Sequence, residues 1–191
     1  MAVENERRAS GDELYRLFLT GDEAAFTTFV ELYEDDLSSF ILGSVNDYHD
    51  AKHLTIETFA QLITGGGKYE GKSSIKTYLF GIGKNLVGQY LKTRRREQHL
   101  SYEEVVGVMI AGNETPYDLI EREESRRQLR ETLKNLKNEY RVVLLLLYFE
   151  DMSYRQAGLV LQKSESQVRN LAHRAKISLK KKLESEGFSY L

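Results

Sequence analysis

Apolar residues recur at steps of three and four along most of this 191-residue chain. In the stretch 22–42 the recurring residues are Phe26, Phe29, Val30, Tyr33, Leu37, Phe40 and Ile41. The stretches 47–64 and 74–96 repeat the pattern, and no run alternates as a half-buried strand does. This period is that of amphipathic helices. It predicts an all-α fold.

One segment interrupts the helical pattern. Residues 98–124 hold the only proline, Pro116, together with many acidic side chains. Helical periodicity resumes at Ser125. We therefore expect two small helical domains, an N-terminal bundle over residues 11–97 and a C-terminal domain over residues 125–186. A flexible acidic linker, residues 98–124, would join them.

The charge of the chain changes sign along its length, although the net charge is only −2. Residues 1–64 carry 4 basic and 13 acidic side chains, whereas residues 65–99 carry 8 basic and 2 acidic ones. Residues 152–191 are basic again, with 8 basic and 3 acidic side chains. Two separate basic segments in an acidic chain favour contact with nucleic acid at two places, and solvated helix faces are the alternative.

The composition excludes several classes of site and protein. The chain has no cysteine, so disulfides, thiolate metal sites and cysteine nucleophiles are excluded, and a reducing compartment is favoured. The first residues lack the apolar core of a signal peptide. The longest apolar run, residues 142–149, is too short to cross a bilayer as a helix. We expect a cytoplasmic protein without cofactor or metal.

Residues 66–73 fit G-x-x-x-x-G-K-S, the pattern of loops that bind nucleotide phosphates. Such a loop needs a buried strand before it, so that the next helix directs its first N–H groups at the phosphates. The preceding ETFAQLIT has helical spacing, and no βαβ alternation occurs. We therefore expect no nucleotide hydrolysis, but a connection between helices in which Ser73 or Ser74 caps the second one. Glycines beside Lys68 and Lys72 also suit close approach of a phosphodiester backbone.

Two S-x-x-Q capping boxes, Ser153 to Gln156 and Ser164 to Gln167, lie eleven positions apart. This spacing leaves room for a short helix from Tyr154 to Leu161, a turn, and a longer helix from Glu165 to about Leu183. The arrangement is typical of a helix-turn-helix. Such turns usually hold glycine where Gln162 stands, so we expect a positive φ angle there.

The second of these helices has an apolar stripe, and its other side chains are of types that contact phosphates and base edges. Ordinary solvated surface is the alternative interpretation. The predicted contacts to duplex DNA are Ser164, Ser166, Gln167, Arg169, Asn170, His173, Arg174 and Lys176.

The two halves together resemble an extracytoplasmic-function (ECF) sigma factor, a promoter-recognition subunit of bacterial RNA polymerase. DAKHLTIETF resembles the family's D-A-E-D-L-x-Q-E-T-F, and KYEGKSSIKTYLFGIGKN resembles K-F-x-G-x-S-S-F-K-T-W-L-x-x-I-A-R-N. LKNLKNEYRVVLLLLYFEDMSYRQ and SESQVRNLAHRAKISLKKKL follow the layout of the fourth conserved region. The chain departs from the family pattern at His53, Ile56, Tyr78, Gln89 and Lys137.

The resemblance implies two protein partners. The helix from about Asp50 to Thr64 would dock on the clamp helices of the polymerase β′ subunit through Asp50, Glu57 and Gln61. The β flap of core polymerase would be a further contact. An anti-sigma protein is a further possible partner.

The resemblance also implies two contacts with promoter DNA. The glycine loop and the next helix would capture an extruded base of the melted minus-ten strand, and the 165–176 helix would read the minus-thirty-five element as duplex. Tyr69 is expected in the core rather than against a base. The minus-ten contacts would be Lys68, Lys72, Ser73, Lys76, Lys84, Asn85, Lys92, Arg94, Arg95 and Arg96.

The sequence therefore predicts a promoter-specificity factor that has no catalytic residues of its own. The alternative is a stand-alone helix-turn-helix regulator of transcription that acts without polymerase. A plain regulator has no need of an acidic first half followed by a basic, glycine-hinged segment.

Overall fold

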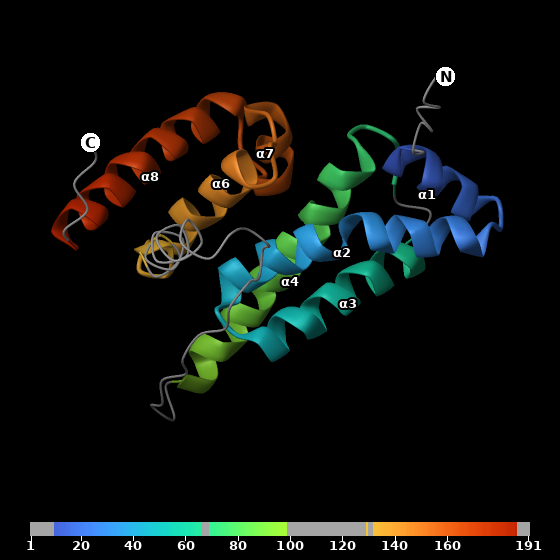
Figure 1. Cartoon of the computed structure of the whole chain (residues 1–191), viewed down its shortest axis with the longest axis horizontal. Helices are drawn as coiled ribbons and strands as arrows, with labels where there is room; N and C mark the ends of the chain where they lie inside the picture. Colours follow the sequence, from blue (N-terminus) through green and yellow to red (C-terminus); the bar gives the residue numbers. More distant parts are fainter. Residues whose placement is uncertain (1–9, 66–68, 99–128, 130–131, 187–191) are drawn as a thin grey trace, which may run out of the picture.

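The computed structural model describes residues 10–65, 69–98, 129 and 132–186. The N-terminal half contains α1 (Gly11–Leu19), α2 (Glu23–Val45), α3 (Tyr48–Thr64) and α4 (Ile75–Gln98). The C-terminal half contains α6 (Asn138–Tyr148), α7 (Tyr154–Leu161) and α8 (Glu165–Ser185), as Figure 1 shows. No strand occurs among the described residues, and the predicted all-α fold is confirmed.

Side-chain caps set the starts of the first three helices. Ser10 forms a capping box with Glu13 at α1, and the Asp22 and Asp47 carboxylates each accept a hydrogen bond from a backbone N–H of α2 and α3. These bonds satisfy N–H groups that have no partner inside the helix. Helix α2 ends at Asn46, which has the left-handed backbone of a helix C-cap, at φ 59°. The chain therefore reverses at this point, and α3 runs back along α2.

Helix α2 lies at the centre of the N-terminal half and contacts α1, α3 and α4. Its Phe29 and Leu37 have no exposed surface. The Phe29 ring lies 5.8 Å from that of Tyr15 in α1 and 6.3 Å from that of Phe59 in α3, measured between centroids. Tilted and edge-to-face pairs of this kind add to the stability that burial provides. The apolar stripe predicted for this stretch is thus the core of the bundle.

The C-terminal half has the predicted helix-turn-helix. Both capping boxes form, at Ser153 and at Ser164, and α7 has the predicted bounds. Gln162 ends α7 with φ 55°, so the positive φ expected at this turn is confirmed. Gly158 explains how the turn closes so tightly, because the Lys163 carbonyl oxygen would lie only 2.7 Å from a Cβ atom at this position.

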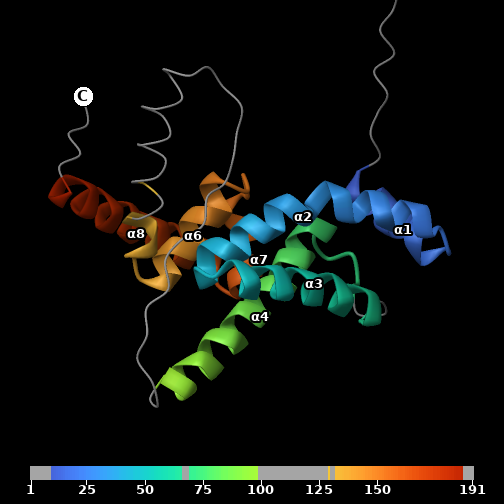
Figure 2. The same ribbon diagram turned by 60° about the horizontal axis from the view of Figure 1, so that its bottom comes forward.

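The two halves pack against each other, α6 on α2 and α7 on α4 (Figures 1 and 2). The Leu145 side chain of α6 lies against Gly43 of α2. The buried Arg141 of α6 donates a hydrogen bond of 3.1 Å to the Ser44 carbonyl in the last turn of α2. That carbonyl belongs to a turn whose oxygens have no partner inside the helix, and a cation is favourable there. One hydrophobic cluster therefore runs through both halves. Residues 99–124 of the predicted linker lie outside the described residues.

The contact at Gly158 predicts an asymmetry between two glycine substitutions. Gly158→Ala should lower the free energy of unfolding by about 1–3 kcal/mol, because the new methyl group would overlap a backbone oxygen that cannot rotate away. Gly88→Ala in α4 should raise it by about 0.5–1 kcal/mol, since nothing lies within 4 Å of the added Cβ. Urea unfolding of both variants measures the difference. Equal effects would contradict the close contact between α7 and the turn.

Candidate nucleic-acid interface

The loop before α4 is held by Asp12 of α1. The Asp12 carboxylate accepts hydrogen bonds from the Tyr69 hydroxyl at 2.8 Å and from the Ile75 backbone N–H at 3.0 Å. Burial, helped by Asp12, raises the pKa of the Tyr69 hydroxyl well above its usual range. The Tyr69 ring packs against Tyr15 and Tyr78, with centroids 5.7 and 5.2 Å away. Tyr69 is therefore half-buried and packs against the hydrophobic core.

The surroundings of this loop differ from those of a nucleotide phosphate site. The preceding element is the helix α3, whereas a phosphate loop follows a strand. The first N–H group of α4 is already bonded to Asp12, and Ser74 accepts a hydrogen bond of 3.3 Å from the Thr77 N–H. The prediction that Ser73 or Ser74 caps this helix is thus confirmed for Ser74. These observations agree with the expectation that this loop is a connection between two helices.

The residues predicted to contact the minus-ten strand lie on the loop before α4 and along α4. They differ in their exposure and in their partners. Lys68 lies outside the described residues. Lys72 is exposed and paired with Glu70, and the Lys84 ammonium lies 3.5 Å from the exposed Asn85 side chain. Ser73 is half-buried, and its carbonyl accepts a hydrogen bond of 2.6 Å from Tyr69. The residues that remain exposed toward the end of α4 are Lys92, Arg95 and Arg96.

Arg94 belongs to a cluster that links α4 to α3. Its guanidinium donates a hydrogen bond of 2.7 Å to the Tyr90 hydroxyl, which donates in turn to the Asp50 carboxylate. A guanidinium nitrogen of Arg94 lies 3.6 Å from a carboxylate oxygen of Asp50. Burial, followed by the bond to Asp50, raises the pKa of the Tyr90 hydroxyl to about 12. A predicted polymerase contact and a predicted DNA contact are thus joined through Tyr90, whose role no sequence motif indicated.

The other two predicted polymerase contacts share one exposed face of α3. The Gln61 amide lies 3.5 Å from the Glu57 carboxylate, as expected for residues four apart on a helix. Ile56 and Ile63 are also exposed on α3, to 59% and 43%. The surface is therefore mixed, with acidic, amide and apolar side chains, and nothing in the described chain covers it.

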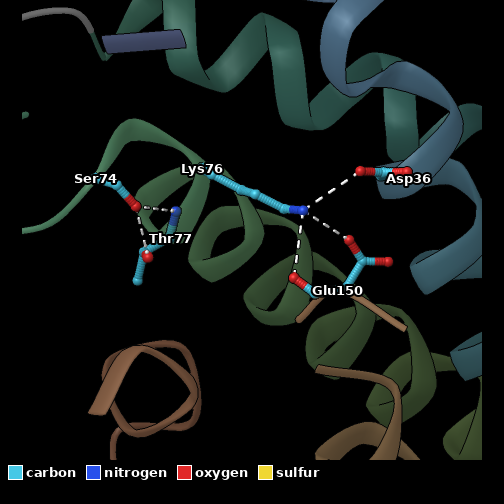
Figure 3. A network of polar contacts seen from close by, with 5 residues as sticks. All are labelled: Asp36, Ser74, Lys76, Thr77 and Glu150. Atoms are coloured by element: carbon cyan, nitrogen blue, oxygen red, sulfur yellow. Dashed lines mark hydrogen bonds and ion pairs between the residues drawn. The ribbon is translucent and has the colours of Figure 1, made fainter. Parts of the chain in front are cut away.

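Lys76 lies where the two halves meet (Figure 3). Its ammonium is 3.3 Å from the Asp36 carboxylate of α2 and 3.2 Å from Oε2 of Glu150, in the turn between α6 and α7. It also donates to the Glu150 carbonyl at 3.4 Å. Burial raises the pKa of the Glu150 carboxyl to about 7, although Lys76 opposes the shift. This predicted DNA contact is therefore occupied by acidic groups of the chain itself.

The reading face of α8 can be derived from its burial pattern. Val168, Leu171, Ala172 and Ala175 are buried. At 100° per residue, one row of exposed residues lies opposite this stripe, with further polar residues on its two flanks. The opposite row is Ser166, Asn170, His173 and Ile177, and the flanking residues are Arg169 and Lys176 on one side and Gln167 and Arg174 on the other.

Arg169 is held on its flank by two neighbours. Its guanidinium lies 2.6 Å from the Glu165 carboxylate and 4.5 Å from the centroid of the Tyr154 ring in α7. On the same flank, the Lys176 ammonium lies 4.9 Å from the Tyr148 ring. Cations over aromatic faces are held in place without losing their charge. Both side chains are thus oriented in advance while they remain exposed.

The remaining predicted residues of α8 lie at its N-terminal end and on the opposite flank. The Ser164 and Gln167 side chains form the capping box, so Ser164 has a structural role. Gln167, Asn170 and Arg174 line a small surface depression together with Glu139, Lys163 and Leu171. Its two cations, Lys163 and Arg174, lie beside one carboxylate, that of Glu139.

The described part of the chain presents no cluster suited to metal catalysis. Within the described ranges, no group of three or more His, Cys, Asp or Glu side chains is arranged so that it could hold a metal ion. In those same ranges, no helix is long and apolar enough to cross a membrane.

Comparison with known families matches both halves of the chain. Residues 29–97 match the family model described as Sigma-70 region 2, and residues 126–179 match the model described as Sigma-70, region 4. The RNA polymerase sigma factor YlaC of Bacillus subtilis (strain 168) is 26% identical over 151 residues, which cover 79% of this chain and 87% of the relative. The ECF RNA polymerase sigma factor SigW of the same organism is 23% identical over 171 residues, which cover 85% of this chain and 91% of the relative.

Two solved structures have a similar fold. One is the sigma factor RpoE in complex with the anti-sigma factor NepR from Bartonella quintana, with a TM-score of 0.67 and 19% identity over 83% of this chain and 96% of that one. The other is CnrH in complex with the cytosolic domain of CnrY, with a TM-score of 0.67 and 20% identity. The match covers 92% of this chain and 99% of that one. The arrangement of helices therefore extends over nearly the whole of both relatives.

The cluster of Asp50, Tyr90 and Arg94 predicts different effects for two adjacent arginines. Arg94→Ala should lower the free energy of unfolding by about 0.5–1.5 kcal/mol, because it removes a hydrogen bond and a partly exposed ion pair. Arg95→Ala should change it by less than about 0.5 kcal/mol, since Arg95 is exposed. Urea unfolding measures both. The same small effect for both variants would mean that the cluster does not stabilise α4.

Proposed function

The chain belongs to the extracytoplasmic-function family of RNA polymerase sigma factors, and on that premise we propose how its two halves divide the recognition of a promoter. Residues 11–97 would dock on core polymerase and hold the melted minus-ten strand. Residues 125–186 would read the minus-thirty-five element as duplex. Residues 98–124 would connect them. The observation that carries the proposal is the pair of basic helices, α4 and α8, one in each half.

We propose that α8 enters the major groove with the row of Ser166, Asn170 and His173 toward the bases. The row is exposed and lies opposite the buried stripe, as the geometry of a recognition helix requires. Arg169 and Arg174 on the two flanks would reach base edges or phosphates on either side. Arg pairs best with guanine and Asn with adenine.

For the N-terminal half we propose that the loop before α4 and the exposed cations of α4 hold the opened strand. Lys72 is on the loop, the half-buried Lys84 and the exposed Asn85 lie near the middle of α4, and the exposed Arg95 and Arg96 lie near its end. In both views the end of α4 projects beyond the other helices (Figures 1 and 2). Binding to a displaced single strand stabilises the melted state, so melting needs no catalytic group. Sigma factors are regulators of transcription rather than enzymes.

The proposed docking surface for polymerase is the exposed face of α3. Glu57 and Gln61 provide polar contacts there, and Ile56 and Ile63 provide apolar area. We also propose the β flap of core polymerase as the partner of the C-terminal half. One of the two solved relatives is a complex with the anti-sigma factor NepR, so an anti-sigma protein is a further proposed partner. Because bacterial polymerase and promoters are cytoplasmic, the proposal places the protein in the cytoplasm.

The proposal predicts transcription from specific starts. The purified protein should be mixed with core RNA polymerase and fragmented genomic DNA of its source, and the transcript starts compared with those of core alone. New starts that share two spaced upstream motifs are the expected result. With core shown to be active by a known sigma factor, the absence of new starts would refute the proposal and favour a stand-alone regulator.

Reading of bases by α8 predicts a change of preference in one variant. Arg169→Ala should weaken binding to the preferred minus-thirty-five duplex by about 1–3 kcal/mol and relax preference at one position. Lys181 lies farther along α8 and is also exposed, so Lys181→Ala should weaken binding to all duplex sequences about equally. Binding of holoenzyme to a set of single-substitution duplexes distinguishes the two. An equal loss on every duplex for Arg169→Ala would exclude base reading by this residue.

A further inference from the structure

Two histidines lie four residues apart on α3. His49 and His53 are both exposed, and residues at this spacing share one face of a helix, with Cβ atoms about 5–6 Å apart. The His49 ring packs edge-on against that of Tyr48, with centroids 6.2 Å apart. Within the described part of the chain, neither imidazole has a hydrogen bond or an ion pair. Both rings therefore have nitrogen atoms available to a ligand that lies between them.

This spacing suits a transition-metal ion. Zinc enzymes use two histidines at i and i+4 of a helix, because both imidazole nitrogens then reach one ion at about 2.0–2.1 Å. Neutral imidazole is a ligand for zinc, copper and nickel, whereas calcium and magnesium prefer oxygen. A structural zinc centre has four protein ligands, so with two of them water would complete the coordination. The pair therefore suits an ion that exchanges with solution.

The charges around the pair offset the charge of a bound cation. Asp47, Asp50 and Glu57 are acidic, and Lys52 is the one basic residue between positions 47 and 57. Arg94 of α4 pairs with Asp50. The N-terminal end of a helix disfavours a cation by itself. Here the Asp47 carboxylate caps that end and accepts a hydrogen bond of 3.0 Å from the Asp50 N–H, so a negative charge lies beside the first turn.

The pair lies on the face of α3 that the proposed function assigns to polymerase docking. At 100° per residue, His53 lies between Ile56 and Glu57 around the helix axis. Ile56 is 59% exposed and provides apolar contact area there. An ion bound at His53 would add charge and firmly held water beside this area, and both resist transfer into a dry interface. Occupation of the site therefore opposes docking.

We propose that His49 and His53 form a binding site for a divalent transition-metal ion of the zinc, nickel and copper class, and that the occupied site blocks docking of α3 on core polymerase. The metal site follows from the pair itself, whereas its regulatory role rests on the proposed function of α3. His53 stands where the family pattern has an acidic residue. The pair is therefore a feature of this chain that family membership does not imply.

Zinc binding by the purified full chain, prepared without an affinity tag, tests the site. The wild-type chain should take zinc from a chromogenic chelator. His49→Ala and His53→Ala should each weaken binding by about tenfold or more, because even groups that only support a metal ligand contribute that much. His173→Ala, which removes an exposed histidine from α8, should leave binding unchanged. Equal binding by the wild-type chain and His49→Ala would overturn the site.

A rearranged pair tests whether the spacing matters. The double variant His53→Ala, Ala60→His keeps the number of histidines, and position 60 is also exposed on α3. The two rings would then be eleven residues apart, about 16 Å along the helix axis, so one ion could not bind both. Zinc binding should stay as weak as in His53→Ala. Binding as tight as that of the wild-type chain would contradict a site built on the four-residue spacing.

The regulatory role is tested by measuring the Kd of the chain for core polymerase with and without added zinc. With zinc at about ten times its own Kd, docking should weaken about tenfold, the factor expected if bound zinc excludes polymerase. The same ratio for the His49→Ala, His53→Ala double variant should be one, which also controls for zinc acting on polymerase. Unchanged or tighter docking of the wild-type chain with zinc would overturn the regulatory role. Failure of the wild-type chain to bind core without zinc would instead overturn the proposed function.

Discussion

Helix α4 is packed on two sides, and most other features of the molecule depend on this. It contacts α1, α2 and α3 on one side and α7 on the other. Phe80, in its middle, has no exposed surface, and its ring lies 5.3 Å from that of Phe40. If the C-terminal half leaves, the apolar surface that α7 covers returns to water at about 25 cal/mol per Å². Separation of the halves therefore needs compensating contacts, which core polymerase and promoter DNA are able to provide.

The change of charge along the sequence has a structural meaning within the same helix. Acidic residues of α2 and α3 form ion pairs with cations of α4. Asp36 of α2 pairs with Lys76, and Asp50 of α3 pairs with Arg94. These pairs are partly exposed and contribute little to stability individually. Their effect is to fix where the charge of α4 lies. The acidic first half of the chain thus organises the basic segment that follows it.

Most of the fold was predictable from the sequence because it depends on local rules. The helical spacing of the apolar residues predicted the helices. The two capping boxes at Ser153 and Ser164 predicted the bounds of α7 and the start of α8. The roles of Asp12, Tyr90 and Glu150 were not predictable. Each acts on a residue at least 40 positions away, through contacts that no local pattern encodes. The candidate site was therefore predicted by residue type, while the partners that restrain its residues appeared only in three dimensions.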